Sequence, residues 1–132
     1  MPTKHLCNNA FLIRIFINNY AANMPIAWLK GDIMIVHLVF FRWKKGTKNS
    51  DVEKIFSDIR ALKKKCEGII GLRCGKNFNN HAHDYTHGLV VSFKDKKSLS
   101  AYNSHPEHKK ILRDIERIEE HVMVIDLVDH HQ

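Results

Sequence analysis

The stretch AYNSHPEH, residues 101–108, places a tyrosine and two histidines around one proline. Pro106 suits the first position of a helix, so His108 is expected in the first turn of that helix. The positive end of a helix disfavours an imidazolium, and an imidazole that stays neutral near pH 7 can act as a general base. Tyr102 can donate a hydrogen bond to a carbonyl or enolate oxygen. Tyr102 and His108 are therefore the predicted catalytic pair.

Three further histidines are predicted to bind substrate in the same site. His37 and His87 fall in apolar segments that read as strands, and His105 directly precedes Pro106. Imidazoles that converge on one apolar pocket form a plausible proton-transfer site. The alternatives stay open: His37 and His87 as hydrogen-bonded core residues, and His105 as a residue that bonds the backbone at the helix break.

A metal site is the competing interpretation of ten histidines. The segment HAHDYTH offers His81, His83 and His87. However, His81 and His83 fall in a predicted loop, and no carboxylate or cysteine completes a recognised ligand spacing. We expect neither a metal nor a cofactor.

The elements that must position these residues follow the order βαββαβ, with the second helical region in two pieces. Ser50 and Glu53 form a predicted capping box for the first helix, and Asp95 is the predicted cap of the next. Apolar runs and periodicity predict a strand at 33–43, a helix at 49–66, strands at 72–78 and 85–93, helical pieces between 95 and 118, and a strand at 121–128.

This order predicts an α+β, ferredoxin-like fold: an antiparallel four-stranded sheet with helices on one face. The first strand is apolar on both sides, with Val36, Leu38 and Phe40 on the side opposite Val39 and Phe41. Helices cover only one side, and an apolar sheet face left in water is an association site. We therefore expect a homodimer in which two sheets close into a dimeric α/β barrel.

The ends of the chain are less well specified. Residues 1–33 read as an N-terminal extension, and the organised pattern suggests a true start at Met34. The apolar run AFLIRIFI contains Arg14 and is far shorter than the roughly 20 residues that span a bilayer, so no membrane partner is expected. Residues 129–132 are predicted to be a frayed tail. Three cysteines without CxxC spacing indicate reduced thiols in the cytoplasm.

The net charge of +7 raises the possibility of a nucleic-acid partner, because the βαββαβ plan also serves RNA-recognition modules. Those modules stack bases on aromatic residues of the first and third strands. The third strand carries Leu89 and Val91 where such aromatics are expected. We expect no nucleic-acid partner.

Three segments in order, IVHLVFFRWK, YTHGLVVSF and Y-x-x-H-P-x-H, resemble the stress-responsive A/B barrel domain family, one of the dimeric α/β-barrel families. The resemblance covers about residues 34–128 and implies a homodimer whose two sheets form a barrel. One plant member is a polyketide cyclase that closes a ring by aldol condensation. The resemblance maps its catalytic tyrosine and histidine onto Tyr102 and His108. It maps the cyclase's pocket histidines onto His37, His87 and His105.

The sequence departs from that cyclase beside the predicted catalytic pair. Polar Asn103 and Ser104 stand where the cyclase has two isoleucines, so a pocket for a long alkyl tail is not expected. Two function hypotheses follow. The first is a homodimer with a His- and Tyr-lined pocket for a small carbonyl-bearing metabolite; the alternative is a non-catalytic, stress-associated dimer with a packed barrel core. An open or a filled barrel interior is expected to distinguish them.

Overall fold

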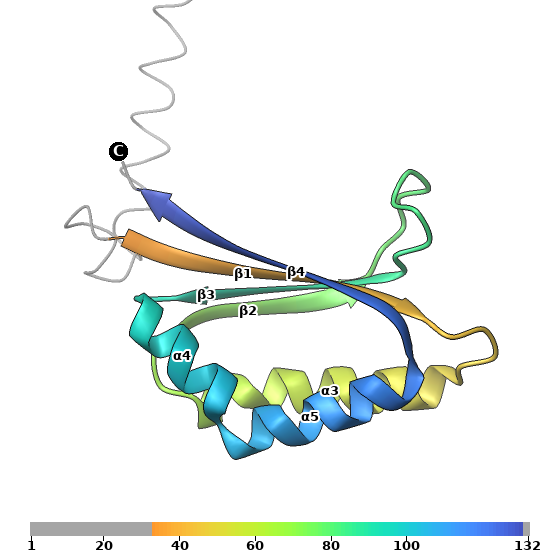
Figure 1. The fold of residues 1–132 in the computed structure, drawn as a ribbon, viewed down its shortest axis with the longest axis horizontal. Helices are drawn as coiled ribbons and strands as arrows, with labels where there is room; N and C mark the ends of the chain where they lie inside the picture. The colour runs from red at the N-terminus through yellow and green to blue at the C-terminus, as the bar shows by residue number, and fades with distance from the viewer. Residues whose placement is uncertain (1–32, 131–132) are drawn as a thin grey trace, which may run out of the picture. The chain divides into compact units, whose positions relative to one another are not determined.

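The computed structural model describes residues 33–130 (Figure 1), and the expectations for residues 1–32 and for the last two residues lie outside this range. The observed order of elements is the predicted one, with the second helical region in two pieces. The elements are β1 (Ile33–Trp43), α3 (Asn49–Lys65), β2 (Ile69–Lys76), β3 (His87–Phe93), α4 (Lys96–Ser104), α5 (Pro106–Ile118) and β4 (Glu119–His130).

The four strands form one antiparallel sheet in the order β2-β3-β1-β4. Figure 1 shows α3, α4 and α5 on one face of this sheet. This is the ferredoxin-like arrangement that the sequence predicts. The register places His37 of β1 opposite Val91 of β3 on one side and opposite Asp126 of β4 on the other.

The core lies between the sheet and α3. The predicted apolar face of α3 is buried throughout, with exposed fractions of 1–7% over the set Val52, Ile55, Phe56, Ile59, Leu62 and Cys66. It packs on the helix side of β1, where Ile35, Val39 and Phe41 are buried, and on Leu89, Val91 and Phe93 of β3. The alternation along β1 agrees with the two sides predicted from the sequence.

Strand boundaries differ from the predictions. β2 begins at Ile69 and not at residue 72, because Gly68 turns the chain straight from α3 into the strand with a φ of 84°. β3 begins at His87, since the amide nitrogen of Tyr85 bonds the carbonyl of Ala82 within the preceding loop. β4 runs to His130, which pairs with Ile33 of β1, so the strand continues into the segment expected to fray.

The predicted capping box of α3 is wrong. The residue before the helix is Lys48, and no side chain caps it. Asp95 does cap α4: its carboxylate accepts a hydrogen bond of 2.7 Å from the amide nitrogen of Ser98. Because α4 carries Tyr102, this cap helps to position the predicted catalytic tyrosine.

Gly68 offers a stability test with an internal control. Gly68 and Gly46 both have a φ of 84°, which favours glycine. A Cβ on Gly68 would overlap the hydroxyl of Ser98 in α4, whereas a Cβ on Gly46 meets nothing within 4 Å. We expect Gly46→Ala to lower the free energy of unfolding by about 1 kcal/mol from backbone strain, and Gly68→Ala by about 3 kcal/mol because overpacking adds to it. Chemical denaturation measures both, and equal losses would contradict the account.

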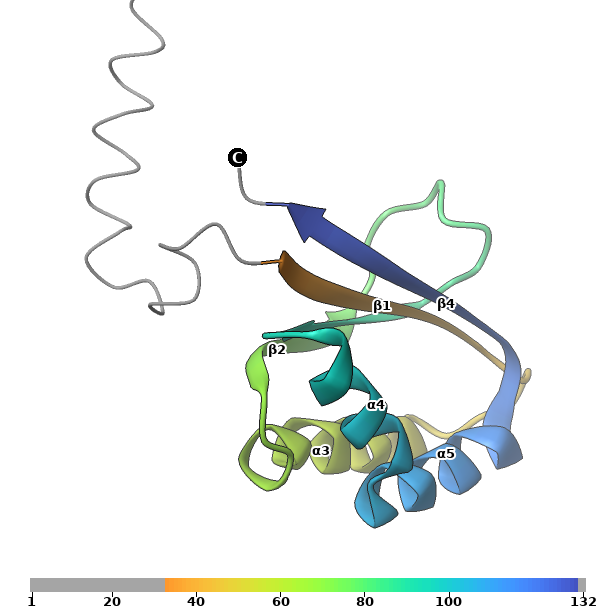
Figure 2. The ribbon, with the colours of Figure 1, turned by 60° about the vertical axis from the view of Figure 1, so that its left-hand side comes forward.

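The sheet face that points away from the helices is apolar, and within residues 33–130 no helix covers it (Figure 2). We call it the open face. Its members on β1 are half-buried, and those on β3 and β4 are 38–47% exposed. The set comprises Val36, Leu38 and Phe40 of β1, Val90 of β3, and Met123, Ile125 and Leu127 of β4.

The open face also corrects one prediction. Leu89 and Val91, expected at the positions of an RNA-stacking platform, are buried on the helix side with exposed fractions of 3% and 0%. The residues of β3 that share the open face are Gly88, Val90 and Ser92. The error is one of strand face, which period-two alternation alone does not assign.

Candidate active site

A cavity of about 300 Å³ lies between the helix side of the sheet and α5. We call it the helix-side cavity. Its deep wall is apolar, formed by buried residues of β1, β3, α3 and α5. The lining residues are His37, Val39, Phe41, Ile59, Leu89, Tyr102, Asn103, His108, Ile111, Leu112, Ile115, Glu116, Glu119, Val122, Val124 and Asp126.

Three of the five sequence-predicted site residues line this cavity: His37, Tyr102 and His108. The ring centroids of Tyr102 and His108 are 4.2 Å apart, and those of Tyr102 and His37 are 5.8 Å apart. All three are buried, with exposed fractions of 6% for His37, 2% for Tyr102 and 8% for His108. A phenol and two imidazoles therefore meet in one small, largely apolar space.

The break between helices α4 and α5 brings Tyr102 and His108 together. Tyr102 lies in the last turn of α4, His105 has an extended backbone, and Pro106 begins α5. Pro106 disfavours helical geometry at the preceding residue, so the chain changes direction there. His108 faces inward with Ile111 and Ile115 from the same side of α5.

The electrostatic environment keeps the His108 imidazole neutral. Burial is the main cause that lowers the pKa of His108, and the nearby His37 and His105 lower it further, against an opposing hydrogen bond. That bond runs from Nδ1 of His108 to the carbonyl oxygen of Asn103, at 3.4 Å. Because a carbonyl only accepts, the hydrogen lies on Nδ1, and Nε2 keeps a lone pair that can take a proton.

Tyr102 has the complementary property. Burial is the main cause that raises the pKa of its hydroxyl far above the usual 10.0, with smaller contributions from Cys66 and Cys74. The hydroxyl therefore stays protonated at all physiological pH values and can donate a hydrogen bond to a substrate oxygen. The site therefore contains a base, His108, and a hydrogen-bond donor, Tyr102.

His37 has a partner that the sequence did not reveal. Its Nδ1 lies 2.6 Å from a carboxylate oxygen of Asp126 on β4. A carboxylate accepts, so Nδ1 of His37 is the donor in this contact. Asp126 thus fixes the orientation of the ring. The available signal was a single carboxylate in the apolar strand HVMVIDLV, but only the register places it opposite His37.

His105 lies beside the cavity and not in its lining. Its Nδ1 accepts a hydrogen bond of 3.1 Å from the amide nitrogen of Glu107, which caps α5. This is the backbone-bonding alternative that the sequence left open. The His105 ring still affects the site, because its proximity to His108 lowers the pKa of His108.

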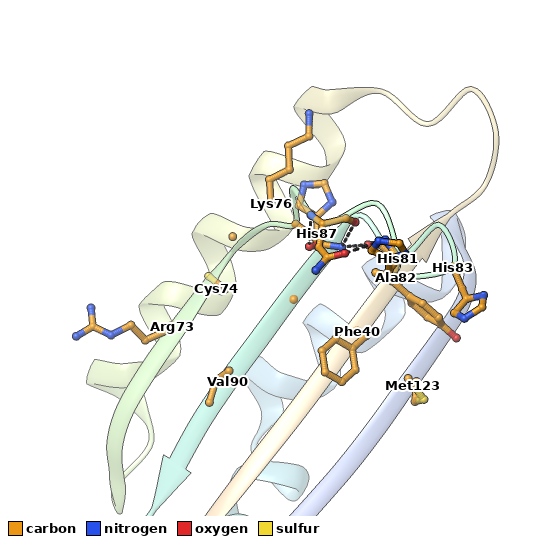
Figure 3. Close-up of a pocket in the computed structure, with 15 residues that line it drawn as sticks. Phe40, Arg73, Cys74, Lys76, His81, Ala82, His83, His87, Val90 and Met123 are labelled. Atoms are coloured by element: carbon orange, nitrogen blue, oxygen red, sulfur yellow. Dashed lines mark hydrogen bonds between the residues drawn. The ribbon is translucent and has the colours of Figure 1, made fainter. Parts of the chain in front are cut away.

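His87 lies apart from the other predicted residues. The indole nitrogen of Trp43 donates to Nδ1 of His87 at 3.0 Å, and the Phe56 ring lies 5.1 Å away between centroids. His87 lines a hollow of about 680 Å³ beneath the loop that joins β2 to β3 (Figure 3). The expectation that His87 converges on the same pocket as His37 is therefore wrong in its geometry.

The segment HAHDYTH does not assemble a ligand cluster. His81, His83 and His87 all line the hollow beneath the loop, but their imidazoles point in different directions in Figure 3. Over residues 33–130, no group of three or more His, Cys, Asp or Glu side chains is placed to hold a metal ion.

The helix-side cavity and the interior of a two-sheet barrel lie on opposite sides of the sheet. The cavity opens on the helix side of the sheet, whereas a barrel made of two sheets would enclose the open face. Whether the barrel interior is filled therefore does not decide whether the Tyr102–His108 pair can reach a ligand.

The pKa of His108 and that of His87, also lowered mainly by burial, make stability depend on pH. Below the usual value of 6.5, the unfolded chain binds these protons while the folded chain resists them. The free energy of unfolding is therefore expected to be fully retained above pH 6.5 and to fall as the pH drops through the folded pKa values. Urea denaturation at pH 7.5 and 5.5 measures the loss. His108→Gln should show a smaller loss than the wild type; an equal loss would contradict this assignment.

With the geometry established, comparison with known proteins gives a family. Residues 35–129 match the model of the Dabb family, described as the Stress Responsive A/B Barrel Domain. The chain belongs to this family. All but the first two residues of β1, all of β3 and the Tyr102–His108 stretch fall within the matched residues of this A/B barrel domain.

Individual relatives agree with this assignment. The Arabidopsis thaliana stress-response A/B barrel domain-containing protein DABB1 is 28% identical over 100 residues, which cover 72% of this chain and 47% of that protein. The chain thus spans about half the length of this relative. A dimeric ferredoxin-like protein of unknown function from Thermobifida fusca has a TM-score of 0.67 at 19% identity, covering 74% of this chain and 92% of that one.

A hydroxynitrile lyase from Passiflora edulis has the same fold. Its TM-score is 0.69 at 16% identity, and the match covers 77% of this chain and 97% of the lyase. At this identity the likeness concerns the fold alone. Within the described part of this A/B barrel domain, the helices are too short or too polar to cross a bilayer.

Proposed function

We propose that the protein is a homodimer that binds and transforms a small carbonyl-bearing metabolite by acid–base chemistry in the helix-side cavity. The observation that carries the proposal is the contact between the buried rings of His108 and Tyr102, whose centroids are 4.2 Å apart. A base and a hydrogen-bond donor at one apolar cavity are the two groups that proton abstraction beside a carbonyl requires.

The proposed step is removal of a proton from the carbon next to the carbonyl group. Nε2 of His108 takes the proton, and the electron pair of the broken C–H bond becomes the C=C bond of an enolate. The negative charge that develops on the carbonyl oxygen accepts the hydrogen bond of the Tyr102 hydroxyl. His37, held by Asp126, contributes a second acceptor nitrogen that binds the substrate.

The dimer is proposed to form through the open face. Seven apolar side chains gather there, and those on β3 and β4 are 38–47% exposed in the single chain. A patch of this kind marks an association surface. The description of the Thermobifida fusca neighbour as dimeric supports the same arrangement for this chain.

We also propose a cytoplasmic location. Cys66 and Cys74 are free thiols, and burial raises the pKa of both, which keeps them in the unreactive thiol form. Free thiols persist in reducing compartments. Cell fractionation with an antibody against the natural protein tests the location, and recovery with secreted material would contradict it.

Binding of a plain ketone tests the site itself. Acetophenone is expected to shift the imidazole NMR resonances of His37 and His108, which line the helix-side cavity. His121 supplies the control within the same spectrum, because its ring lies outside this lining and contacts Tyr85. If acetophenone shifts none of these resonances, or shifts His121 as much as His108, the alternative of a non-catalytic stable dimer takes the place of this proposal.

A further inference from the structure

The mouth of the helix-side cavity is acidic although the chain carries a net charge of +7. The deep lining residues are apolar side chains, imidazoles and the Tyr102 phenol. The solvent-facing lining residues include Glu116 on α5 and Asp126 on β4, and Glu119 is half-buried where α5 meets β4. Three carboxylates from two elements thus line this solvent-facing part, which we call the mouth, and that of Asp126 also accepts the hydrogen bond of His37.

No fixed positive charge balances these carboxylates within the part of the cavity lining that the structure describes, since none of its members is lysine or arginine. Lys109 and Lys110 of α5 are exposed and lie outside the lining. His108 is neutral, and Glu107 occupies the first turn of α5, where it offsets the partial positive charge of the helix end.

The size of the cavity limits the ligand further. A volume of about 300 Å³ corresponds to roughly ten water molecules at ~30 Å³ each, which suits a compact molecule and not one with a long tail. An anion entering this space would lose hydration and find like charges at the mouth. Like-charge juxtaposition is a strong means of rejecting a wrong ligand.

We infer that Glu116, Glu119 and Asp126 act as a charge filter, so that the substrate is a compact carbonyl compound without negative charge, and carboxylates and phosphate esters are rejected. This inference rests on the proposed function and narrows its substrate class. The overall basic charge of the protein would suggest the opposite preference, so the filter is a local property of the mouth.

Three probes of the same size and shape test the filter: neutral benzamide, anionic benzoate and cationic benzamidinium. Dissociation constants come from NMR titration of the His108 imidazole in the full chain at low salt, where charge effects are least screened. Benzamide and benzamidinium are expected to bind, and benzoate to bind about tenfold or more weakly. Benzoate binding as tightly as benzamide would overturn the inference while leaving the proposed site intact.

Two matched variants distinguish the effect of charge at the mouth from the effect of the protein's net charge. Glu116→Gln removes one charge at the entrance, and Glu67→Gln removes one from an exposed position outside the lining. Glu116→Gln is expected to strengthen benzoate binding severalfold relative to benzamide, and Glu67→Gln to leave the ratio unchanged. Equal changes in the two variants would overturn the inference. Failure of all three probes to reach His108 would instead overturn the proposed function, and the filter with it.

Discussion

Ile125→Asp is expected to convert the proposed dimer into folded monomers. Ile125 lies on the open face of β4, opposite Leu38 of β1, and is 38% exposed in the single chain. In a two-fold dimer each substitution appears twice at one interface, and an uncompensated charge buried there costs several kcal/mol. At about 1.4 kcal/mol for each factor of ten, the dissociation constant should rise about a thousandfold or more.

Ala101→Asp is the matched control for the open face. Ala101 is exposed on α4, in the layer of helices that covers the other side of the sheet. It introduces the same carboxylate and should leave the dimer intact. Native mass spectrometry distinguishes the two assemblies, and circular dichroism checks that both variants are folded. A variant carrying Ile125→Asp that stays dimeric would show that the chains associate elsewhere.

His108→Ala is expected to abolish the proposed proton abstraction while the protein keeps its fold and its proposed dimer. Loss of a general base typically costs a factor of 10² to 10⁴ in rate, and His108 is the group proposed to take the substrate proton. Tyr102→Phe removes only the hydroxyl and keeps the ring that packs on His37 and Phe93. It should lower the rate by about tenfold to a thousandfold.

The histidine experiment needs a variant that preserves packing. His108 is 8% exposed, so truncation to alanine leaves a cavity and lowers stability; His108→Gln fills most of that space. His121→Ala, at an exposed position outside the lining, is the control and should keep the wild-type rate. If His108→Gln is folded, dimeric and fully active, His108 is not the base. Unfolding of both His108 variants would leave it with a structural role.

Much of this architecture is local and was therefore predictable. The spacing of apolar residues predicted the helix that is α3, and the alternation along the first strand predicted the two sides of β1. Tyr102 and His108 are six positions apart around Pro106, so one helix break brings them together. The contacts between site residues on neighbouring strands were not predictable, because sheet register follows from strand pairing and not from local sequence.

Strand pairing brings Asp126 next to His37 and places His87 away from it. Asp126 is 89 positions from His37, and only the pairing of β1 with β4 makes them partners. His87 lies on the helix side of the sheet, as His37 does, but it pairs with Phe41. Phe41 lies four residues from His37 along β1, or ~13 Å at roughly 3.3 Å per residue. The lack of a side-chain cap on α3 likewise shows that a capping-box pattern alone does not set where a helix begins.

His108 is proposed to abstract a proton beside a carbonyl while the Tyr102 hydroxyl donates a hydrogen bond to the carbonyl oxygen. Proton exchange measures this step without knowledge of the natural substrate. Acetophenone in D₂O exchanges its methyl protons through the enolate, and ¹H NMR follows the loss of their signal. The wild-type protein should accelerate this exchange by about a hundredfold or more over His108→Gln at equal ketone occupancy. Exchange at the same rate in both proteins, with acetophenone bound in the helix-side cavity, would contradict the account.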